Sequence, residues 1–516
     1  MKEKTHRQLL IIFLIGTISL CLGCQNNASD KTVDEVGVNG AQDGTATSDF
    51  DDVTIKKFQE PTLSINNATV DFDFDKIKKR GSLIAVVDNS STSYFIYKGN
   101  RMGYEFDLLE RFADDLGVDL EIKITNDIQG AFAMLDNGNA DIMAYHLTVT
   151  KERSKVVAFS DELNEVKQVL IQRKPKNWRK MKAHEIEDAL IRNPLDLVGK
   201  EILVRQGSAF SSRLESLSDE IGGNINIVEV EGEVDTETLI ERVSEGENIY
   251  TVADSDIGMI NAAYDYNIDA KTEISFPQKI AWAMRLNAPK LKKEVDNWLG
   301  GMKSRPDFNM IYDRYFKYTR SQTARVNSDF SSTGGGKLSK YDDLIKEAAE
   351  DLSIDWMLLS SQVYQESKFD AKAESWAGAK GLMQLMDISM RQFKVKDPFN
   401  AAKNLEGGIR HMKWLEDYWE DEITDPRELI KFVLGSYNVG QGHVKDAMSL
   451  AKKFGKNPQK WDDVGYYLIQ KSKSKFYNDP VVRYGYCRGT EPVNYVEDIF
   501  LRYEQYKLVL GQEQSE

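Results

Sequence analysis

Apolar runs typical of buried strands alternate with segments of helical spacing in the first part of the chain. Strands are predicted at 83–89, 120–125 and 141–147, and helices at 104–117 and 131–138. The pattern restarts at 202–217, where a strand leads through Gly207 and Ser208 into a helix. This βαβ succession predicts an α/β domain with two mostly parallel sheets in series and a site between them.

From Tyr341 onward the pattern is helical only. Apolar residues recur at a spacing of three to four positions in five segments: 341–352, 354–367, 401–419, 429–440 and 493–510. No strand alternation persists there. We therefore expect a compact all-α domain of roughly 165 residues, which is enough for a core of its own.

The amino-terminal segment has the form of an export signal. Basic residues precede the apolar run LLIIFLIGTISLCLG (9–23), which is shorter than the roughly 20 residues of a membrane span. The alternative is a buried core helix. The ending CLGC resembles a bacterial lipoprotein signal, which implies cleavage, a lipid on Cys24 and membrane attachment through it. Gln25 then implies the outer membrane, facing the periplasm, in a cell with two membranes.

Polar stretches separate the predicted parts. Residues 25–60 are rich in Asn, Asp, Ser, Thr and Gly, which is typical of a solvated tether. In the stretch 321–340, three glycines (334–336) follow polar residues and indicate a second boundary. The predicted parts are a signal (1–23), an acylated cysteine and tether (24–74), the α/β domain (75–318), a linker (319–340), the all-α domain (341–505) and a tail (506–516).

Composition narrows the class of partner. The 516 residues are 41% hydrophobic and 29% charged, as in an ordinary globular protein of two or three domains. A net charge of −15 argues against a nucleic-acid partner, which would need a basic face. Five scattered histidines lack metal-ligand spacing, so we expect no metal and no other cofactor. With Cys21 lost in the signal, Cys487 is left without a disulfide partner.

Four motifs in the α/β region resemble the bacterial periplasmic solute-binding proteins of the polar amino acid type. They are GYEFDLLERFADDLG (103–117), LTVTKERSKVVAFS (147–160), VRQGS (204–208) and ADSD (253–256). The resemblance implies a two-lobed, type II binding-protein fold with an amino acid or a muropeptide as its ligand.

The same resemblance assigns roles to single residues. Arg153 stands where an arginine grips the ligand's carboxylate, and a planar fork of donors suits that role. Thr148 stands where a small hydroxyl residue assists, and Ser208 lies at a strand-to-helix turn whose free amides hold an anion. Asp254 matches the acid that meets the ligand's amino group. His146 replaces a serine of the family. Arg153 as a surface ion-pair partner and Asp254 as a helix cap are the alternatives.

Glu366 lies near the end of the predicted helix 354–367. The inner face of that helix holds Met357, Leu358 and Val363, so the carboxyl group lies at the edge of an apolar surface. Partial desolvation raises the pKa of a carboxyl group and keeps its proton near neutral pH. A general acid needs this property. Most glutamates at helix ends are solvated, so position alone leaves both readings open.

The residues after Glu366 resemble the lytic transglycosylases of the soluble-lytic-transglycosylase type, which have a lysozyme-like fold. The matching residues are Glu366-Ser367, Ser375, Gly381-Leu382-Met383-Gln384, Ser436-Tyr437-Asn438-Val439-Gly440, and Glu491, Tyr495 and Val496. Asp387 departs from the pattern, which usually has proline there. The resemblance implies that Ser375, Gln384, Met386 and Tyr437 line the cleft, that Tyr437 positions Glu366, and that Asn438 braces the loop.

The resemblance also implies a reaction on peptidoglycan glycan strands. Glu366 would protonate the oxygen between N-acetylmuramic acid and N-acetylglucosamine, and its carboxylate would then deprotonate the muramyl C6 hydroxyl. A 1,6-anhydro ring forms without water. A lysozyme-type hydrolase would instead need Glu374, Asp370 or Asp387 opposite Glu366. A solute-binding receptor with an inert helical domain is the other alternative. Coupling of the two domains by a wall-derived ligand is a further hypothesis.

Overall fold

The computed structural model describes residues 70–230 and 234–511. The predicted export signal, Cys24 and most of the tether lie outside these residues. Among the described helices, none combines the length and the apolar character needed to cross a bilayer.

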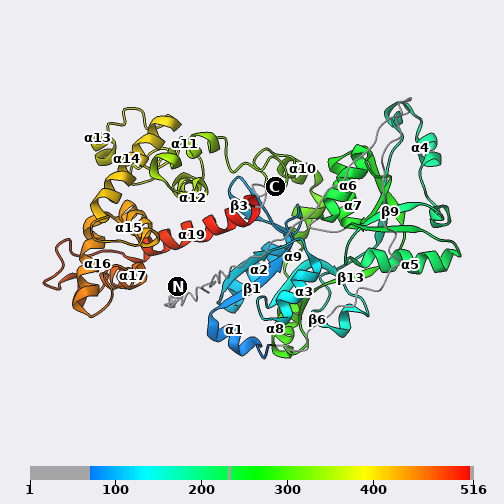
Figure 1. The fold of residues 1–516 in the computed structure, drawn as a ribbon, viewed down its shortest axis with the longest axis horizontal. Coiled ribbons are helices and arrows are strands. Elements are labelled where there is room, and N and C mark those ends of the chain that lie inside the picture. The colour runs from blue at the N-terminus through cyan, green and yellow to red at the C-terminus, as the bar shows by residue number, and fades with distance from the viewer. Residues whose placement is uncertain (1–69, 231–233, 512–516) are drawn as a thin grey trace, which may run out of the picture. The chain divides into compact units, whose positions relative to one another are not determined.

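The first lobe of the α/β domain is built on a six-stranded sheet (Figure 1). The order is β4-β1-β5-β13-β6, and β7 also pairs with β13. The strands are β1 (Ser82–Val87), β4 (Asp119–Ile124), β5 (Ile142–Thr148), β6 (Val157–Phe159), β7 (Asn164–Val166) and β13 (Gln278–Arg285). The helices are α1 (Phe74–Arg80), α2 (Tyr104–Leu116), α3 (Ile128–Asp136), α8 (Pro289–Met302) and α9 (Pro306–Tyr312), with η1 (Arg153–Lys155) and η4 (Asp313–Lys317).

The second lobe has a five-stranded sheet in the order β10-β9-β11-β8-β12. Its strands are β8 (Gln168–Arg173), β9 (Glu201–Arg205), β10 (Asn226–Val230), β11 (Tyr250–Asp254) and β12 (Ile268–Glu273). Its helices are α4 (Ala183–Ala189), α5 (Ala209–Ile221), α6 (Thr236–Glu245) and α7 (Ser255–Tyr264), with η2 (Trp178–Lys180) and η3 (Pro194–Leu197).

The two sheets are nested along the chain rather than arranged in series. The chain leaves the first sheet after β7, builds the second sheet, and returns as β13, which pairs antiparallel with β5 and β6. Two crossings between the lobes follow from this path. The expectation of sheets in series missed it, because β13 resembles any other apolar strand and only its pairing places it in the first lobe.

The segment predicted as a linker is packed rather than extended. It contains α10 (Thr319–Val326), and Leu338 is buried. Backbone bonds join it to the hairpin of β2 (Phe95–Tyr97) and β3 (Asn100–Met102): the Ser332 N–H donates to the Ile96 carbonyl, and the Lys98 N–H to the Phe330 carbonyl. The polar residues and the three glycines indicated a domain boundary, and the hairpin edge supplies partners for the backbone of this segment.

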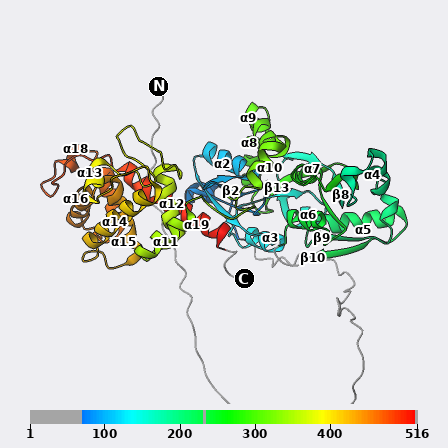
Figure 2. The ribbon, with the colours of Figure 1, turned by 90° about the horizontal axis from the view of Figure 1, so that it is seen from above.

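The carboxy-terminal domain is all-α, as predicted from its periodicity. Its helices are α11 (Asp342–Leu352), α12 (Trp356–Ser367), α13 (Asp387–Gln392), α14 (Ala401–Trp419), α15 (Pro426–Val439), α16 (Gln441–Lys453), α17 (Trp461–Gln470), α18 (Ser474–Tyr477) and α19 (Thr490–Leu510). Figure 2 shows α13, α14, α15, α16 and α18 gathered together. They enclose a core of their own around Leu359, Met412 and Trp419.

The long helix α19 continues through residues predicted to be a tail. Tyr506, Val509 and Leu510 are buried and join the apolar cluster of the first lobe. Figure 1 shows the carboxy-terminal end of α19 beside β3. The last helical turns are therefore ordered by contact with the α/β domain, which helical periodicity alone does not reveal.

Candidate active site and ligand pocket

Glu366 is held in the last turn of α12. This helix begins where the Asp355 side chain accepts a hydrogen bond from the Met357 N–H (2.9 Å), a typical N-cap. It ends because Lys368 and Phe369 both take left-handed backbone angles, with φ of 53° and 61°. The turn fixes Glu366 at the edge of the helical core, where the sequence places it.

Burial sets the electrostatic state of Glu366. Desolvation raises the pKa of its carboxyl group to about 7, and a hydrogen bond from Tyr495 acts in the opposite direction. The Tyr495 hydroxyl donates to Glu366 Oε1 over 2.5 Å. Among the described residues, no second carboxylate contributes to this shift. The site therefore keeps a single proton available near neutral pH.

Tyr437 does not make the hydrogen bond to Glu366 that the resemblance suggested. Its hydroxyl donates to the Met383 carbonyl (2.8 Å), although the Glu366 charge helps to raise the pKa of the phenol. Tyr495, on α19, makes the hydrogen bond to Glu366 instead. The sequence showed Tyr495 only as a motif residue, because the approach of α19 to α12 joins positions far apart in the chain.

Ser375 and Gln384 make side-chain hydrogen bonds within the loop that follows Glu366 in the sequence. Ser375 Oγ accepts from the Ala379 N–H (3.0 Å) and closes a tight turn. Gln384 has a positive φ of 45°, and its amide nitrogen donates to the Ala373 (3.2 Å) and Gly381 (3.0 Å) carbonyls. These bonds leave the Gln384 side-chain oxygen available as an acceptor.

A buried asparagine that we did not single out supports the same loop. Asn404, on α14, accepts from the Met383 N–H (2.7 Å) and donates to the Lys380 and Pro398 carbonyls (both 2.9 Å). Gly381 lies so close to the Pro398 backbone that a Cβ at position 381 would be 2.2 Å from the Pro398 carbonyl oxygen. An asparagine on the apolar face of a predicted helix was the available signal, since buried amides need partners.

The remaining predicted cleft residues differ in exposure. Met386 is 44% exposed and Asn438 is exposed, so both can meet a ligand. Met383, a residue of the same motif, is buried in the helical core.

The acids that a hydrolase would need lie in solvent. Glu374 and Asp387 are exposed and approach Lys380 at 3.9 and 3.7 Å. Asp370 is exposed in a turn, where its side chain accepts from the Lys372 N–H. None of the three adds to the pKa shift of Glu366. The geometry thus offers one acid in the helical domain and no matched partner among the described residues.

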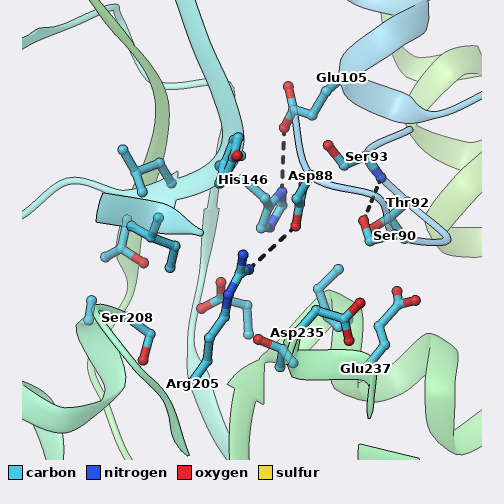
Figure 3. Close-up of a pocket in the computed structure, with 18 of the residues that line it drawn as sticks. Asp88, Ser90, Thr92, Ser93, Glu105, His146, Arg205, Ser208, Asp235 and Glu237 are labelled. Atoms are coloured by element: carbon cyan, nitrogen blue, oxygen red, sulfur yellow. Dashed lines mark hydrogen bonds and ion pairs between the residues drawn. The ribbon is translucent and has the colours of Figure 1, made fainter. Parts of the chain in front are cut away.

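A second site lies between the two lobes of the α/β domain (Figure 3). Arg153, Thr148, Ser208 and Asp254 all line this pocket, so the structure brings together every ligand-binding residue that we predicted. Arg153 is buried, and burial lowers the pKa of its guanidinium to about 10. It donates to the Thr148 carbonyl (2.9 Å) and the Gly207 carbonyl (3.0 Å), one in each lobe. The alternative of a surface ion pair is wrong.

Asp254 and Ser208 keep unused polar atoms in the pocket. Asp254 precedes α7, but its side chain does not cap that helix, so the alternative reading as a cap is also wrong. Its Oδ1 and the Ser208 Oγ have no hydrogen-bond partner among the described residues. Burial raises the pKa of Asp254 to about 7.

His146 takes the place of the serine that the solute-binding family usually has. Burial lowers the pKa of its imidazole, but Asp256, Asp254 and Glu105 outweigh this and raise it to about 10. His146 Nε2 lies 3.2 Å from Asp256, and Nδ1 lies 3.8 Å from Glu105. The carboxylates of Asp256, Asp254 and Glu105 thus favour the cationic form of this imidazole.

Family models match both domains. The model of bacterial extracellular solute-binding proteins, family 3, matches residues 83–318, and the transglycosylase SLT domain matches 343–460. The α/β domain therefore has the two-lobed type II binding-protein fold, and the helical domain is lysozyme-like. Among solved structures, the P235GK mutant of an arginine-binding protein from T. maritima is 24% identical to this chain and covers 47% of this chain and 98% of its own, with a TM-score of 0.39.

Curated relatives span both domains together. Membrane-bound lytic murein transglycosylase F of Desulfosudis oleivorans is 34% identical over 84% of this chain and 91% of its own length. The protein of that name from Pseudomonas fluorescens (strain Pf0-1) is 30% identical over 83% of this chain and 85% of its own. The α/β domain with its pocket and the helical domain with its single acid thus both align with these relatives. It belongs to the membrane-bound lytic murein transglycosylase F family.

Proposed function

We propose that this lytic transglycosylase cleaves the glycan strands of peptidoglycan with Glu366 as its one acid and base. The observation that carries the proposal is the isolation of that carboxyl group. It is half-buried, desolvation raises its pKa to about 7, and its side-chain hydrogen-bond partner is Tyr495 rather than a second acid. An acid with a pKa near the working pH is suited to give and to take a proton in turn.

The reaction follows from one carboxyl group acting twice. Protonated Glu366 gives its proton to the oxygen between N-acetylmuramic acid and N-acetylglucosamine, and the C1–O bond breaks. The carboxylate then takes the proton of the muramyl C6 hydroxyl, whose oxygen bonds to C1. The products are a 1,6-anhydromuramyl end and a free N-acetylglucosamine 4-hydroxyl. Because the nucleophile is attached to the substrate, proximity lowers the barrier without a positioned water.

Surrounding residues would hold the sugar in place. Gln384 keeps an acceptor oxygen beside the loop, and Met386 and Asn438 offer exposed contacts. Tyr495 orients the carboxylate between the two proton transfers. In this arrangement the helical domain needs neither a metal nor a second carboxylate for cleavage.

Product analysis tests the proposal. Purified peptidoglycan treated with the wild-type chain is expected to yield muropeptides with anhydro ends, and Glu366→Gln is expected to yield none above background. Glu374→Gln is the matched control, because Glu374 is an exposed acid near the same loop, and it should keep full activity. Reducing ends from the wild type would contradict the proposed lyase chemistry.

The α/β domain is proposed to regulate the enzyme by binding an amino acid or a muropeptide. Arg153 and Asp254 offer a cation and an anion in one buried pocket, which suits a ligand with free carboxyl and amino groups. A ligand that binds one arrangement of the lobes better than another shifts the population toward it.

The β2–β3 hairpin supports this coupling. It follows the pocket residues Ser90, Thr92 and Ser93 directly in the chain. At its turn, the Gly99 carbonyl accepts from the Tyr506 hydroxyl (3.1 Å), and the Asn100 side chain accepts from the Tyr364 hydroxyl.

The two tyrosines that donate these hydrogen bonds lie on the helices that contain Glu366 and Tyr495. Tyr364 lies on α12 with Glu366, and Tyr506 lies on α19 with Tyr495. Movement of the pocket loop would therefore reach both catalytic side chains. Arg153→Ala is expected to abolish ligand binding and ligand-dependent activity while keeping basal activity. Unchanged binding and unchanged ligand response in that variant would refute the regulatory proposal.

We further propose that a lipid on Cys24 anchors the chain in the outer membrane, facing the periplasm. The sequence CLGC and the following Gln25 support this, and the membrane-bound names of the relatives agree with a place in the cell envelope. Cys24→Ala should lose incorporation of radiolabelled palmitate. Retained label would contradict attachment at this cysteine.

A further inference from the structure

The pocket between the lobes has more negative than positive side chains. Its lining carboxylates are Asp88, Glu105, Asp235, Glu237 and Asp254, and its lining cations are Arg153, Arg205 and His146. His146 already faces Glu105 and Asp256, and Arg205 lies 3.5 Å from Asp88. Among the described residues, Asp235, Glu237 and Asp254 form no ion pair at all. The charge of Arg205 acts on Asp235, and the charges of His146 and Arg153 act on Asp254, but none of these cations lies within ion-pair distance. Since a buried carboxylate without an ion-pair partner is costly, the pocket favours a positively charged occupant.

Two residues that line this pocket keep unused acceptor atoms. Asp254 Oδ1 and Asp88 Oδ1 have no hydrogen-bond partner among the described residues, and these residues are only 6% and 7% exposed. Buried polar atoms in native proteins are normally paired. Ammonium or guanidinium donors of a ligand would satisfy both oxygens.

The polar groups fall into two ends. Figure 3 shows Ser208 on one side of the Arg205 side chain, and Asp235 and Glu237 on the other. Ser208 begins α5, whose first free amides favour an anion, and its Oγ has no partner. With Arg153, which bonds the carbonyl next to Ser208, this end suits a carboxylate.

The other end suits a cation. Asp235 and Glu237 lie two residues apart at the start of α6. Burial raises the pKa of both, Glu237 to about 7, and the Asp235 charge adds to the shift of Glu237. Glu237 accepts from the Ser91 N–H (3.0 Å) and hydroxyl (2.7 Å), which ties this end to the loop before the hairpin. A ligand cation here would relieve the repulsion between the two acids.

We infer that the pocket selects a ligand with one carboxylate and two cationic groups, which is the chemistry of a diamino acid. The carboxylate lies at the end with Arg153 and Ser208, the α-amino group at Asp254, and the second cation at Asp235 and Glu237. Apolar side chains such as Ile257 and Phe316 line the pocket and suit the methylene stem. The inference rests on the proposed ligand pocket and adds the class of ligand. A free diamino acid and a wall peptide ending in one share this chemistry.

Calorimetry on the detergent-solubilised full chain tests the inference. L-Lysine is the probe, and L-norleucine, which lacks only the terminal amine, is its control. A hydrogen-bonded charge contributes roughly 1.5–3 kcal/mol, so lysine is expected to bind about 10–100-fold tighter. The double variant Asp235→Asn, Glu237→Gln should lose this preference and keep norleucine affinity. Glu241→Gln, an exposed acid of the same helix, should change neither affinity.

The outcomes separate the two levels of the proposal. Equal affinity within both pairs of probes, lysine with norleucine and L-alanyl-L-lysine with L-alanyl-L-norleucine, would overturn the diamino inference and leave the ligand pocket standing. If these two probes and the dipeptides L-alanyl-L-lysine and L-alanyl-L-norleucine all fail to bind, the proposed pocket itself fails. A preference for lysine over norleucine identifies a free amino acid as the source, and a preference confined to the dipeptides identifies a peptide.

Discussion

Removal of the Tyr495 hydroxyl is expected to shift the pH dependence of catalysis. The hydroxyl donates to Glu366 over 2.5 Å, and this bond lowers the pKa that burial raises to about 7. Tyr495→Phe leaves the burial and deletes the bond, so the pKa of Glu366 rises further. Because the first step needs protonated Glu366, activity falls as pH rises through that pKa. The decline in the variant therefore lies at higher pH than in the wild type.

The size of the shift follows from the hydrogen bond. A bond to a charged group contributes roughly 1.5–3 kcal/mol, and 1.36 kcal/mol corresponds to about one pH unit, so the decline should move up by about one to two units. The plateau rate should also fall by about 10–100-fold, because the carboxyl group loses its orientation.

Release of dye from labelled sacculi, followed from about pH 5 to about pH 9, measures both effects across the relevant pKa. Tyr437→Phe is the matched control, since its hydroxyl donates to the Met383 carbonyl rather than to Glu366. The control should keep the wild-type midpoint. Equal midpoints in the wild type and Tyr495→Phe, or an equal shift in both variants, would refute the reasoning.

Three further changes are predicted to act on stability. Glu366→Gln should stabilise the chain by up to about 3 kcal/mol at pH 8 and by almost nothing at pH 4. The folded pKa of Glu366 is about 7 and lies above the ordinary 4.5, so the wild type loses stability as pH rises through that interval and the variant does not. Urea unfolding at both pH values measures this, and an equal gain at each would contradict it. Asn404→Ala should cost about 2–4 kcal/mol and slow cleavage, because three backbone groups lose their partner, whereas exposed Asn438→Ala should leave unfolding nearly unchanged. Similar unfolding midpoints for the two variants would count against a supporting role for Asn404. Gly99→Ala should cost more than Gly117→Ala: both have positive φ, but a Cβ at 99 would lie 2.6 Å from a tyrosine ring of α12, whereas nothing lies within 4 Å at 117. Thermal unfolding compares them, and equal losses would show that the hairpin yields freely.

The local periodicity of hydrophobic residues predicted most of the helices and strands. The helix predicted at 401–419 is α14 to the residue, and the strand predicted at 83–89 is β1 within two residues at each end. These signals are local, since one face of each element meets a core. The return of the chain as β13 was not predictable in the same way, because strand pairing depends on partners more than 100 residues apart.

The residues of the candidate sites also differ in whether a local or a long-range signal reveals them. Glu366 could be recognised because its motif is contiguous, and its raised pKa follows from burial at a helix end. Tyr495 and Asn404 act on the motif from α19 and α14, so only the packing of these helices reveals their roles. Likewise Asp235 and Glu237 have no distinctive sequence context. They become informative only when the second lobe places them opposite the loop that contains Ser91.

Cleavage in water enriched in oxygen-18 tests the central claim most directly. The account holds that Glu366 moves both protons and that the muramyl C6 oxygen closes the ring. New muramyl ends examined by mass spectrometry should therefore be lighter than hydrolysed ends by one water molecule and should carry no label. Labelled reducing ends would mean that water attacks the bond, and a single carboxyl group could then no longer account for the reaction.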